Sequence, residues 1–376
     1  MGNRGWRERI GGEDTHSFGF LGRMGATGAE CRPGHEALAV RLLKHLAAAA
    51  VSSSSSDVDN GAAGNLILSP LSIYAALALV AAGARGPTLE ELLGVLGAPS
   101  RDALARFVAA AAKRALTDRS ASGGPCVAFA SGVWCDASRE LKPAFLDAVV
   151  GSHNATTSAV DFRNKPEEAC RRINAWVAEV TRNLITSVLN PTSVRPDSLI
   201  VLANAVYFKG QWQQPFDKKY TVDRKFFLLD GGSVTVPFMQ SWEDQFIACY
   251  DDFKGLEMPY KNRDVVPVPD MDDPNFWELF MKRDDRATED HPRFSMCVFL
   301  PTARDGLQSL VDRIASEEEG FLARHLPKMS FAVDEFRVPK FKLSFSGILV
   351  GILDRLGMRL PFNRRRADLS DMRPGC

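Results

Sequence analysis

The sequence has no surplus of either charge, because its 46 lysine and arginine residues equal its 46 aspartate and glutamate residues. Without a net positive field, nucleic acids and anionic membranes are disfavoured as partners. The sequence also lacks a long apolar run. The longest, from Leu71 to Ala84, is shorter than the ~20 residues needed to cross a bilayer, and it therefore predicts a buried helix.

A secretory leader is not recognisable, because no apolar stretch follows Arg4, Arg7 and Arg9. The 7 cysteines are odd in number and include no C-x-x-C pair. This pattern disfavours a disulfide framework or a structural zinc site, and it fits a reducing compartment. We therefore expect a cytoplasmic location.

Local motifs of common enzyme classes are also missing: there is no G-x-G-x-x-G, G-x-x-x-x-G-K, H-E-x-x-H or G-x-S-x-G. The histidines lack a carboxylate or thiol at a diagnostic spacing, so we expect each at the surface or in a capping role. They are His16, His35, His45, His153, His291 and His325. We predict no catalytic residue, no cofactor site and no metal site, and hence no enzyme.

Two segments stand apart from the rest of the chain. Residues 1–34 are rich in glycine and have little periodicity, which predicts a flexible N-terminal extension before one domain over 35–376. Residues 261–292 hold nine acidic residues, five basic residues and four prolines without a sustained period. We interpret them as an exposed polar insertion in that domain.

Helical spacing of apolar residues dominates the first half of the chain. Ser69 and Pro70 suit the start of the apolar helix 70–84, and Thr88 with Glu91 forms a capping box that predicts the start of the next helix. Further helices are expected over 35–50, 104–115 and 143–150, from Pro166 onward, and around Ile348, Ile352 and Leu356.

Strands are predicted mainly in the second half. Residues 199–208 are apolar apart from Asn204, which predicts a strand buried on both faces and an amide that needs buried partners. Shorter strands are expected at 125–135, 225–229, 233–238, 246–250 and 294–300, and within 331–345.

Several segments together resemble the serpin family, most closely its plant-type members. The first is NLILSPLS at 65–72, followed by the apolar helix and GARGPTLEELLGVLG. The later ones, in order, are LANAVYFKGQWQQPFD at 202–217, FMQS at 238–241, FSMCVFLPTARDGLQSLV at 294–311, VPKFKLSFS at 338–346 and LDRLGMRLPF at 353–362.

This resemblance implies a mixed α+β fold in a single domain, with three β-sheets and eight to nine helices. Ser69, Ser72 and Asn204 match the family's shutter, a buried hydrogen-bonded group beneath the place where the main sheet opens. Lys209, Gly210 and Trp212 match the breach, where loop insertion begins.

The resemblance also implies a mechanism, in which an exposed loop is cleaved by a target protease and then inserts into the main sheet. That loop is expected beyond ADLSDM at 367–372, and the sequence given stops at Cys376. We therefore expect a serpin relative that lacks the C-terminal strands and the reactive loop and does not inhibit.

Two alternatives stay open. If the true chain continues past Met372, the protein is a suicide-substrate inhibitor of a serine or cysteine protease. The family resemblance by itself also allows an extracellular location. Otherwise an unpaired sheet edge can recruit a strand-donating protein partner. Without the C-terminal strands, we also expect the helix 70–84 to be uncovered and the protein to be marginally stable.

Overall fold

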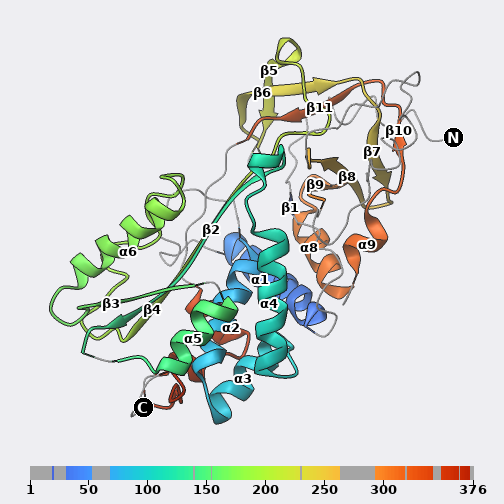
Figure 1. Ribbon diagram of the computed structural model, residues 1–376. Coiled ribbons are helices and arrows are strands. Elements are labelled where there is room, and N and C mark those ends of the chain that lie inside the picture. Colours follow the sequence, from blue (N-terminus) through green and yellow to red (C-terminus); the bar gives the residue numbers. More distant parts are fainter. Residues whose placement is uncertain are drawn as a thin grey trace, which may run out of the picture.

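A long pair of strands forms the axis of the molecule (Figure 1). In the computed structural model, β2 (Cys126–Asp136) and β4 (Ile200–Lys209) extend from a group of helices at one end to two other sheets at the opposite end. The described residues are 19–20, 31–52, 68–138, 140–153, 155–228, 231–262, 293–317, 320–341, 349–363 and 365–372.

The long sheet has the strand order β3-β2-β4. β2 pairs antiparallel with β4 through ten residue pairs, from Cys126 and Lys209 at one end to Cys135 and Ile200 at the other. The short strand β3 (Thr156–Val160) lies parallel to β2 on its other side. Among the described residues, no strand pairs with the second edge of β4.

The other two sheets lie at the far end of β2 and β4 (Figure 1). The expected number of three sheets is confirmed. The five-stranded sheet has the order β1 (Gly19–Phe20), β9 (Ser295–Pro301), β8 (Phe253–Pro259), β7 (Gln245–Cys249) and β10 (Ser330–Phe331). The small sheet has the order β11 (Phe336–Pro339), β6 (Ser233–Ser241) and β5 (Val222–Phe227).

Nine α-helices occur in the described part of the chain, within the expected range. Five of them gather at the end of the long sheet where β4 begins (Figure 1): α1 (Arg32–Ser52), α2 (Pro70–Gly83), α3 (Gly86–Leu96), α4 (Arg101–Ala115) and α5 (Pro143–His153). The others are α6 (Pro166–Val180), α8 (Leu307–Ser316), α9 (Phe321–His325) and α10 (Val350–Arg355). Short 3-10 helices are η1 (Ser120–Ser122), η2 (Lys218–Tyr220) and η3 (Leu360–Phe362).

The two faces of β4 pack against different helices. Ala203 and Ala205 contact hydrophobic side chains of α6, including Val177. Leu202 packs with the helices on the opposite face. Only Ala203 and Ala205 are fully buried, so the expectation of complete burial on both faces was too strong. β4 is less buried than expected because no described strand covers its second edge.

The helix α2 is covered, contrary to the expectation from the sequence. Tyr74 and Leu79 are 0% exposed, and most of the helix is buried. Its neighbours are α1, α3, α4, α5 and β4, which together enclose the apolar surface. The prediction of an exposed apolar helix was wrong, because the helices of the N-terminal half supply its cover.

The capping box predicted at Thr88 and Glu91 is also wrong. α3 begins earlier, at Gly86, and Arg85 occupies the N-cap position. The hydroxyl of Thr88 instead accepts a hydrogen bond from the backbone N–H of Asp368 at 3.0 Å. The carboxylate of Glu91 accepts one from the N–H of Leu360 at 2.7 Å. Both side chains therefore hold a distant part of the chain against α3.

The structure bears differently on the two segments that the composition set apart, residues 1–34 and residues 261–292. Within 1–34, residues 19–20 form β1 and α1 begins at Arg32, so the structure begins before the expected start at His35. Most of the predicted insertion, 263–292, lies outside the described residues. Its flanks meet, since the N–H of Phe294 donates to the side-chain oxygen of Asn262 at 3.3 Å.

The segment 367–372 is anchored at the junction of α2, α3 and α5. The carboxylate of Asp371 binds Arg85 at 2.6 Å and Arg101 at 3.0 Å. Met372 is 1% exposed and packs with Phe145. These contacts place the segment beside Ile200 and Leu202, the first and third residues of β4.

We predict that Asp371→Asn destabilises the protein by about 1–2 kcal/mol at pH 7, because two arginines lose their charged acceptor. Burial alone would raise the pKa of Asp371, but the hydrogen bonds from Arg101 and Arg85 hold that pKa below its ordinary value. The contribution is therefore present at neutral pH and is lost as the pH falls below about 4. Urea unfolding at several pH values measures it.

Asp305→Asn is the matched control, because Asp305 is an exposed aspartate. Its substitution should change the free energy of unfolding by less than about 0.5 kcal/mol. An equal effect of the two substitutions, or an Asp371→Asn effect that does not depend on pH, would contradict the assigned role of Asp371.

Candidate functional site

Asn204 lies at the centre of a polar group between β4, β2 and α2. Its side-chain nitrogen donates to the backbone carbonyl of Ser72 at 2.8 Å. Its side-chain oxygen accepts from the hydroxyl of Ser131 at 3.1 Å. Ser131 faces Asn204 in the register of β2 and β4. The amide that the sequence marked as needing partners therefore has them.

Ser69 and Ser72 belong to the first turn of α2. The hydroxyl of Ser69, the N-cap residue, accepts a hydrogen bond from the N–H of Ser72 at 3.3 Å. This contact satisfies one of the N–H groups that a helix start leaves without an internal partner. Asn204 binds the backbone of Ser72, so the three shutter-like residues form one connected chain from the helix start to β4.

The breach-like residues lie at the other end of β4. Trp212 stacks on the ring of Tyr260 at a centroid separation of 4.5 Å and an interplanar angle of 12°. The two residues also form an isolated β-bridge. Phe208, near the end of β4, meets the same tyrosine ring edge-on at 5.0 Å. Tyr260 thus joins the end of β4 to the segment that follows β8.

Gly210 and Lys209 have separate roles here. A Cβ atom on Gly210 would lie 2.4 Å from the ring of Tyr260, so only glycine allows this close approach. Lys209 is the last residue of β4, pairs with Cys126 of β2 and has an exposed side chain.

Burial raises the pKa of Tyr260 to about 12, with a smaller contribution from Cys297, so its hydroxyl stays protonated at neutral pH.

These two groups lie along one strand, about 17 Å apart by the rise of an extended chain between Asn204 and Lys209. One is half-buried beside α2 in the middle of β4, and the other packs aromatic rings at its end. Among the described residues, β4 is also one of the two edge strands of its sheet. Both groups therefore lie along the strand with which an additional strand would pair.

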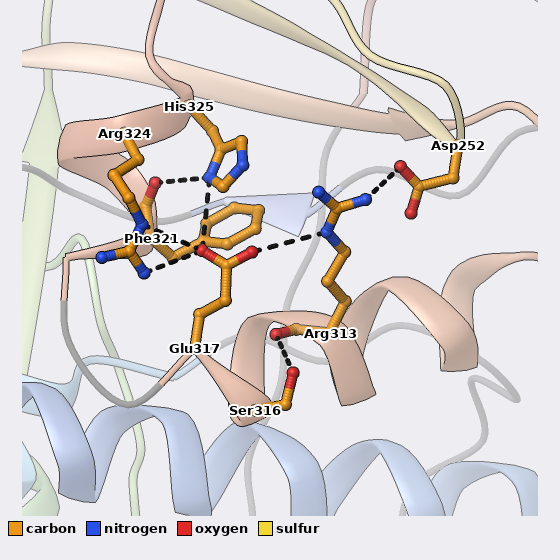
Figure 2. Close-up of polar contacts among 7 residues, drawn as sticks. All are labelled: Asp252, Arg313, Ser316, Glu317, Phe321, Arg324 and His325. Carbon is orange, nitrogen blue, oxygen red and sulfur yellow. Dashed lines mark hydrogen bonds and ion pairs between the residues drawn. The ribbon is translucent and has the colours of Figure 1, made fainter.

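A further polar cluster lies between α8, α9 and the turn from β7 to β8 (Figure 2). The carboxylate of Glu317 binds Arg324 at 2.8 Å and Arg313 at 3.4 Å. Arg313 also pairs with Asp252, and its guanidinium lies 5.1 Å from the ring centre of Phe253. The cluster links the two helices to the five-stranded sheet.

His325 closes this cluster from α9 (Figure 2). Its Nδ1 atom is 2.9 Å from the carbonyl oxygen of Phe321 and 3.6 Å from the carboxylate of Glu317. Burial alone would raise the pKa of Glu317, but Arg324, His325 and Arg313 hold it below its ordinary value. The carboxylate is thus held as a charged partner of the arginines, which suits a structural role rather than acid catalysis.

Three described histidines can be compared with the sequence-based expectation. His325 contacts a carbonyl of its own helix, as a capping residue does, although it is buried rather than exposed. His35 is buried against the rings of Tyr74 and Phe107, so the expected surface or capping role was wrong there. His45 is half-buried in α1. In the described residues, no group of three histidine, cysteine, aspartate or glutamate side chains is arranged to hold a metal ion.

Ser131 and Tyr260 were missed by the sequence reasoning. Ser131 is the one hydroxyl residue between Cys126 and Cys135, a signal that becomes meaningful only when β2 is paired with β4 in the observed register. Tyr260 follows β8, a strand that the sequence pattern did not predict.

Within the described residues, no helix has the length and apolar content to cross a bilayer.

We predict that Asn204→Ala lowers the free energy of unfolding by about 2–3 kcal/mol, because it leaves the carbonyl of Ser72 and the hydroxyl of Ser131 without their partner. Urea unfolding followed by tryptophan fluorescence measures this loss. A double-mutant cycle with Ser131→Ala should give a coupling energy of about 1 kcal/mol, since the two side chains share a hydrogen bond.

Asn164→Ala is the control, because Asn164 is an exposed asparagine that hydrogen bonds to the nearby Asp161. It should cost less than about 1 kcal/mol. Additive effects of Asn204→Ala and Ser131→Ala would show that the two side chains are not coupled.

Comparison with known proteins agrees with this geometry. A family model described as Serpin (serine protease inhibitor) matches residues 35–375. A putative serpin-Z6C of Oryza sativa subsp. japonica is 48% identical over 343 residues, which is 90% of this chain and 76% of the relative. Serpin-Z2A of the same organism is 44% identical over 349 residues, or 91% of this chain and 79% of the relative.

A solved structure leads to the same conclusion. The Arabidopsis protein AtSerpin1, in its native stressed conformation, superimposes with a TM-score of 0.79 and 34% sequence identity. The match covers 94% of this chain and 80% of the Arabidopsis chain. The family model and the relatives indicate the same family. The mixed α+β fold with three sheets is consistent with it. This chain belongs to the serpin family and is of the plant type.

Proposed function

We propose that these 376 residues form a serpin body with a strand-acceptor edge on β4, that they do not trap a protease by themselves, and that they are not an enzyme. The observation that supports this most is the pairing of β4, which has ten partners in β2 on one edge and no described strand on the other. The family's target is a protease, and the ancestral target is accordingly a serine or cysteine protease.

Trapping by a serpin needs two components: an acceptor position in the main sheet and an exposed loop that is cleaved and inserts there. β4 fits the acceptor, with the Asn204 group beneath its middle and the Trp212 group at its end. The described residues of this chain contain no segment that we assign to the loop. The acceptor without the loop favours a role other than inhibition.

Inhibition is the alternative if these residues are part of a longer chain that continues past Met372. The anchored segment 367–372 brings Met372 to the hydrophobic cluster that includes Ile200 and Leu202. A continuation would therefore start near the beginning of β4. The shutter-like and breach-like groups would then act during loop insertion.

The test is incubation of the 376-residue protein with trypsin, chymotrypsin and papain, followed by denaturing gels and assays of residual protease activity. We expect no complex that survives denaturation and full protease activity, because no loop is available to form an acyl-enzyme. A known inhibitory serpin is the positive control. A denaturation-resistant band at the summed mass, absent with an active-site-inactivated protease, would overturn the proposal.

A strand-addition module is the second candidate, and the open edge of β4 favours it. An edge strand presents unpaired N–H and C=O groups that an extended segment from another protein can pair with. The acceptor is long, since β4 has ten residues. Its partner would be an extended, apolar peptide that pairs through its backbone.

A synthetic twelve-residue peptide of alternating valine and threonine tests this second candidate. At 100 times its dissociation constant, the peptide stabilises the protein by about 2.7 kcal/mol, and we expect the melting temperature to rise by about 3 °C or more. Hydrogen exchange should slow at β4. The control peptide has proline at alternate positions, and no difference between the two peptides would exclude strand addition.

A further inference from the structure

The helix α1 carries three basic residues close together on its surface. Lys44 and His45 lie three and four residues after Arg41, so both are surface neighbours of Arg41, with about 5–6 Å between Cβ atoms. Arg41 and Lys44 are exposed, and His45 is half-buried. The chain as a whole has no surplus of either charge, so this concentration of basic groups is local.

Two neighbouring helices, α10 and α8, add to this group. The exposed Arg355 belongs to the last turn of α10, which packs against α1. Arg41 donates a hydrogen bond to the backbone carbonyl of the next residue, Leu356, at 2.8 Å. Lys44 pairs with Asp312 of α8 at 3.5 Å. These contacts hold α1 and the end of α10 together with their basic side chains on a shared surface.

The ion pairs at this surface leave two arginines without a carboxylate. Asp354 of α10 pairs with Arg359 at 3.6 Å. Within the part of the chain that the structure describes, neither Arg41 nor Arg355 forms an ion pair. The group therefore has a net positive charge even when its histidine is neutral.

His45 lies within the field of these cations. Burial lowers the pKa of His45, and the positive charges of Arg355, Arg41 and Lys44 lower it further. The imidazole is therefore neutral at neutral pH. An anion among these groups would have the opposite effect, because a nearby negative charge favours the protonated form of histidine.

Helix capping explains only part of this arrangement. Cations near the C-terminal carbonyls of a helix are favourable, which accounts for Arg41 and Arg355 at the end of α10. It does not account for His45, whose charged neighbours are cations that repel its protonated form. Binding of an anion would offset the repulsion among all of these groups.

We propose that Arg41, His45 and Arg355 form a binding site for a compact tetrahedral oxyanion, a sulfate or the phosphate group of a small molecule, and that the anion binds together with a proton on His45. The two arginines supply permanent positive charge, and the imidazolium adds a charge-assisted hydrogen bond. Lys44 flanks the site and is held by Asp312. This inference concerns a different part of the molecule from β4 and does not depend on the function proposed above.

Sulfate is the probe for the test, because its own charge does not change between about pH 5.5 and 8, so any pH dependence belongs to the protein. NMR titrations of the full chain with sulfate are made at both pH values, with chloride keeping the ionic strength constant. We expect a dissociation constant about tenfold lower at the acidic pH, from one additional charge-assisted hydrogen bond. The pKa of His45 should rise by about one unit at saturating sulfate, because the two binding equilibria are linked.

Three variants locate the site. Arg355→Gln should raise the dissociation constant about tenfold at both pH values. Arg359→Gln is the matched control, because it removes an exposed arginine that already pairs with Asp354, and it should have less than about a twofold effect. His45→Gln should bind sulfate as the unchanged protein does at the alkaline pH and should lose the gain at the acidic pH.

Two results with these variants would overturn the proposal. Equal effects of Arg355→Gln and Arg359→Gln would show that sulfate is attracted by surface charge in general. A gain at acidic pH that persists in His45→Gln would show that the linked proton binds elsewhere.

A sulfated dextran distinguishes a free oxyanion from one carried by a polymer. We expect a similar affinity per sulfate group for the two forms, because the site holds one group. Much tighter binding of the polymer that Arg355→Gln does not weaken would contradict a compact site.

Discussion

The backbone ladder between β2 and β4 is the constraint on which the rest of the structure depends. Its ten residue pairs fix which side chains of β4 face α6 and which face α2. They also bring Ser131 opposite Asn204 and bind Lys209, the last residue of β4, to Cys126. Both groups that the family resemblance implicates, one in the middle of β4 and one beyond its end, therefore hold their positions through a single hydrogen-bonded register.

Polar groups that are buried or half-buried explain much of the remaining organisation. Asn204, Thr88 and Glu91 each receive or donate hydrogen bonds across long stretches of sequence, and each joins two elements that would otherwise meet only through apolar contacts. Asp371 does the same with two arginines. The helices that surround α2 are thereby tied to the segment that ends beside β4, so the covering of α2 and the position of Met372 have a common origin.

The local sequence pattern was enough to predict helices and strands whose formation depends on residues that are close in sequence. The helices α2, α4, α5 and α6 and the strand β4 follow from apolar spacing and from residues such as Ser69 and Pro166. The strand β8 was missed because a glycine and two charged residues interrupt its apolar pattern. Thr88 and Glu91 were misassigned as a local capping box because their partners, Asp368 and Leu360, lie far along the chain. Of the candidate site, Asn204 stood out as a polar residue in an apolar strand, whereas Ser131 and Tyr260 became visible only through long-range pairing.

The geometry of the ladder also determines how the molecule resists mechanical force. A pull along the axis of β4 loads its hydrogen bonds to β2 in shear, so that many must fail together. A pull at right angles to the strand, away from β2, loads the pairs one after another from Ile200 or from Lys209. Ala203 and Ala205 add little side-chain bulk at the centre of the strand, so resistance to such peeling there comes mainly from the backbone. The protein is therefore expected to be mechanically anisotropic, stiff along β4 and compliant across it.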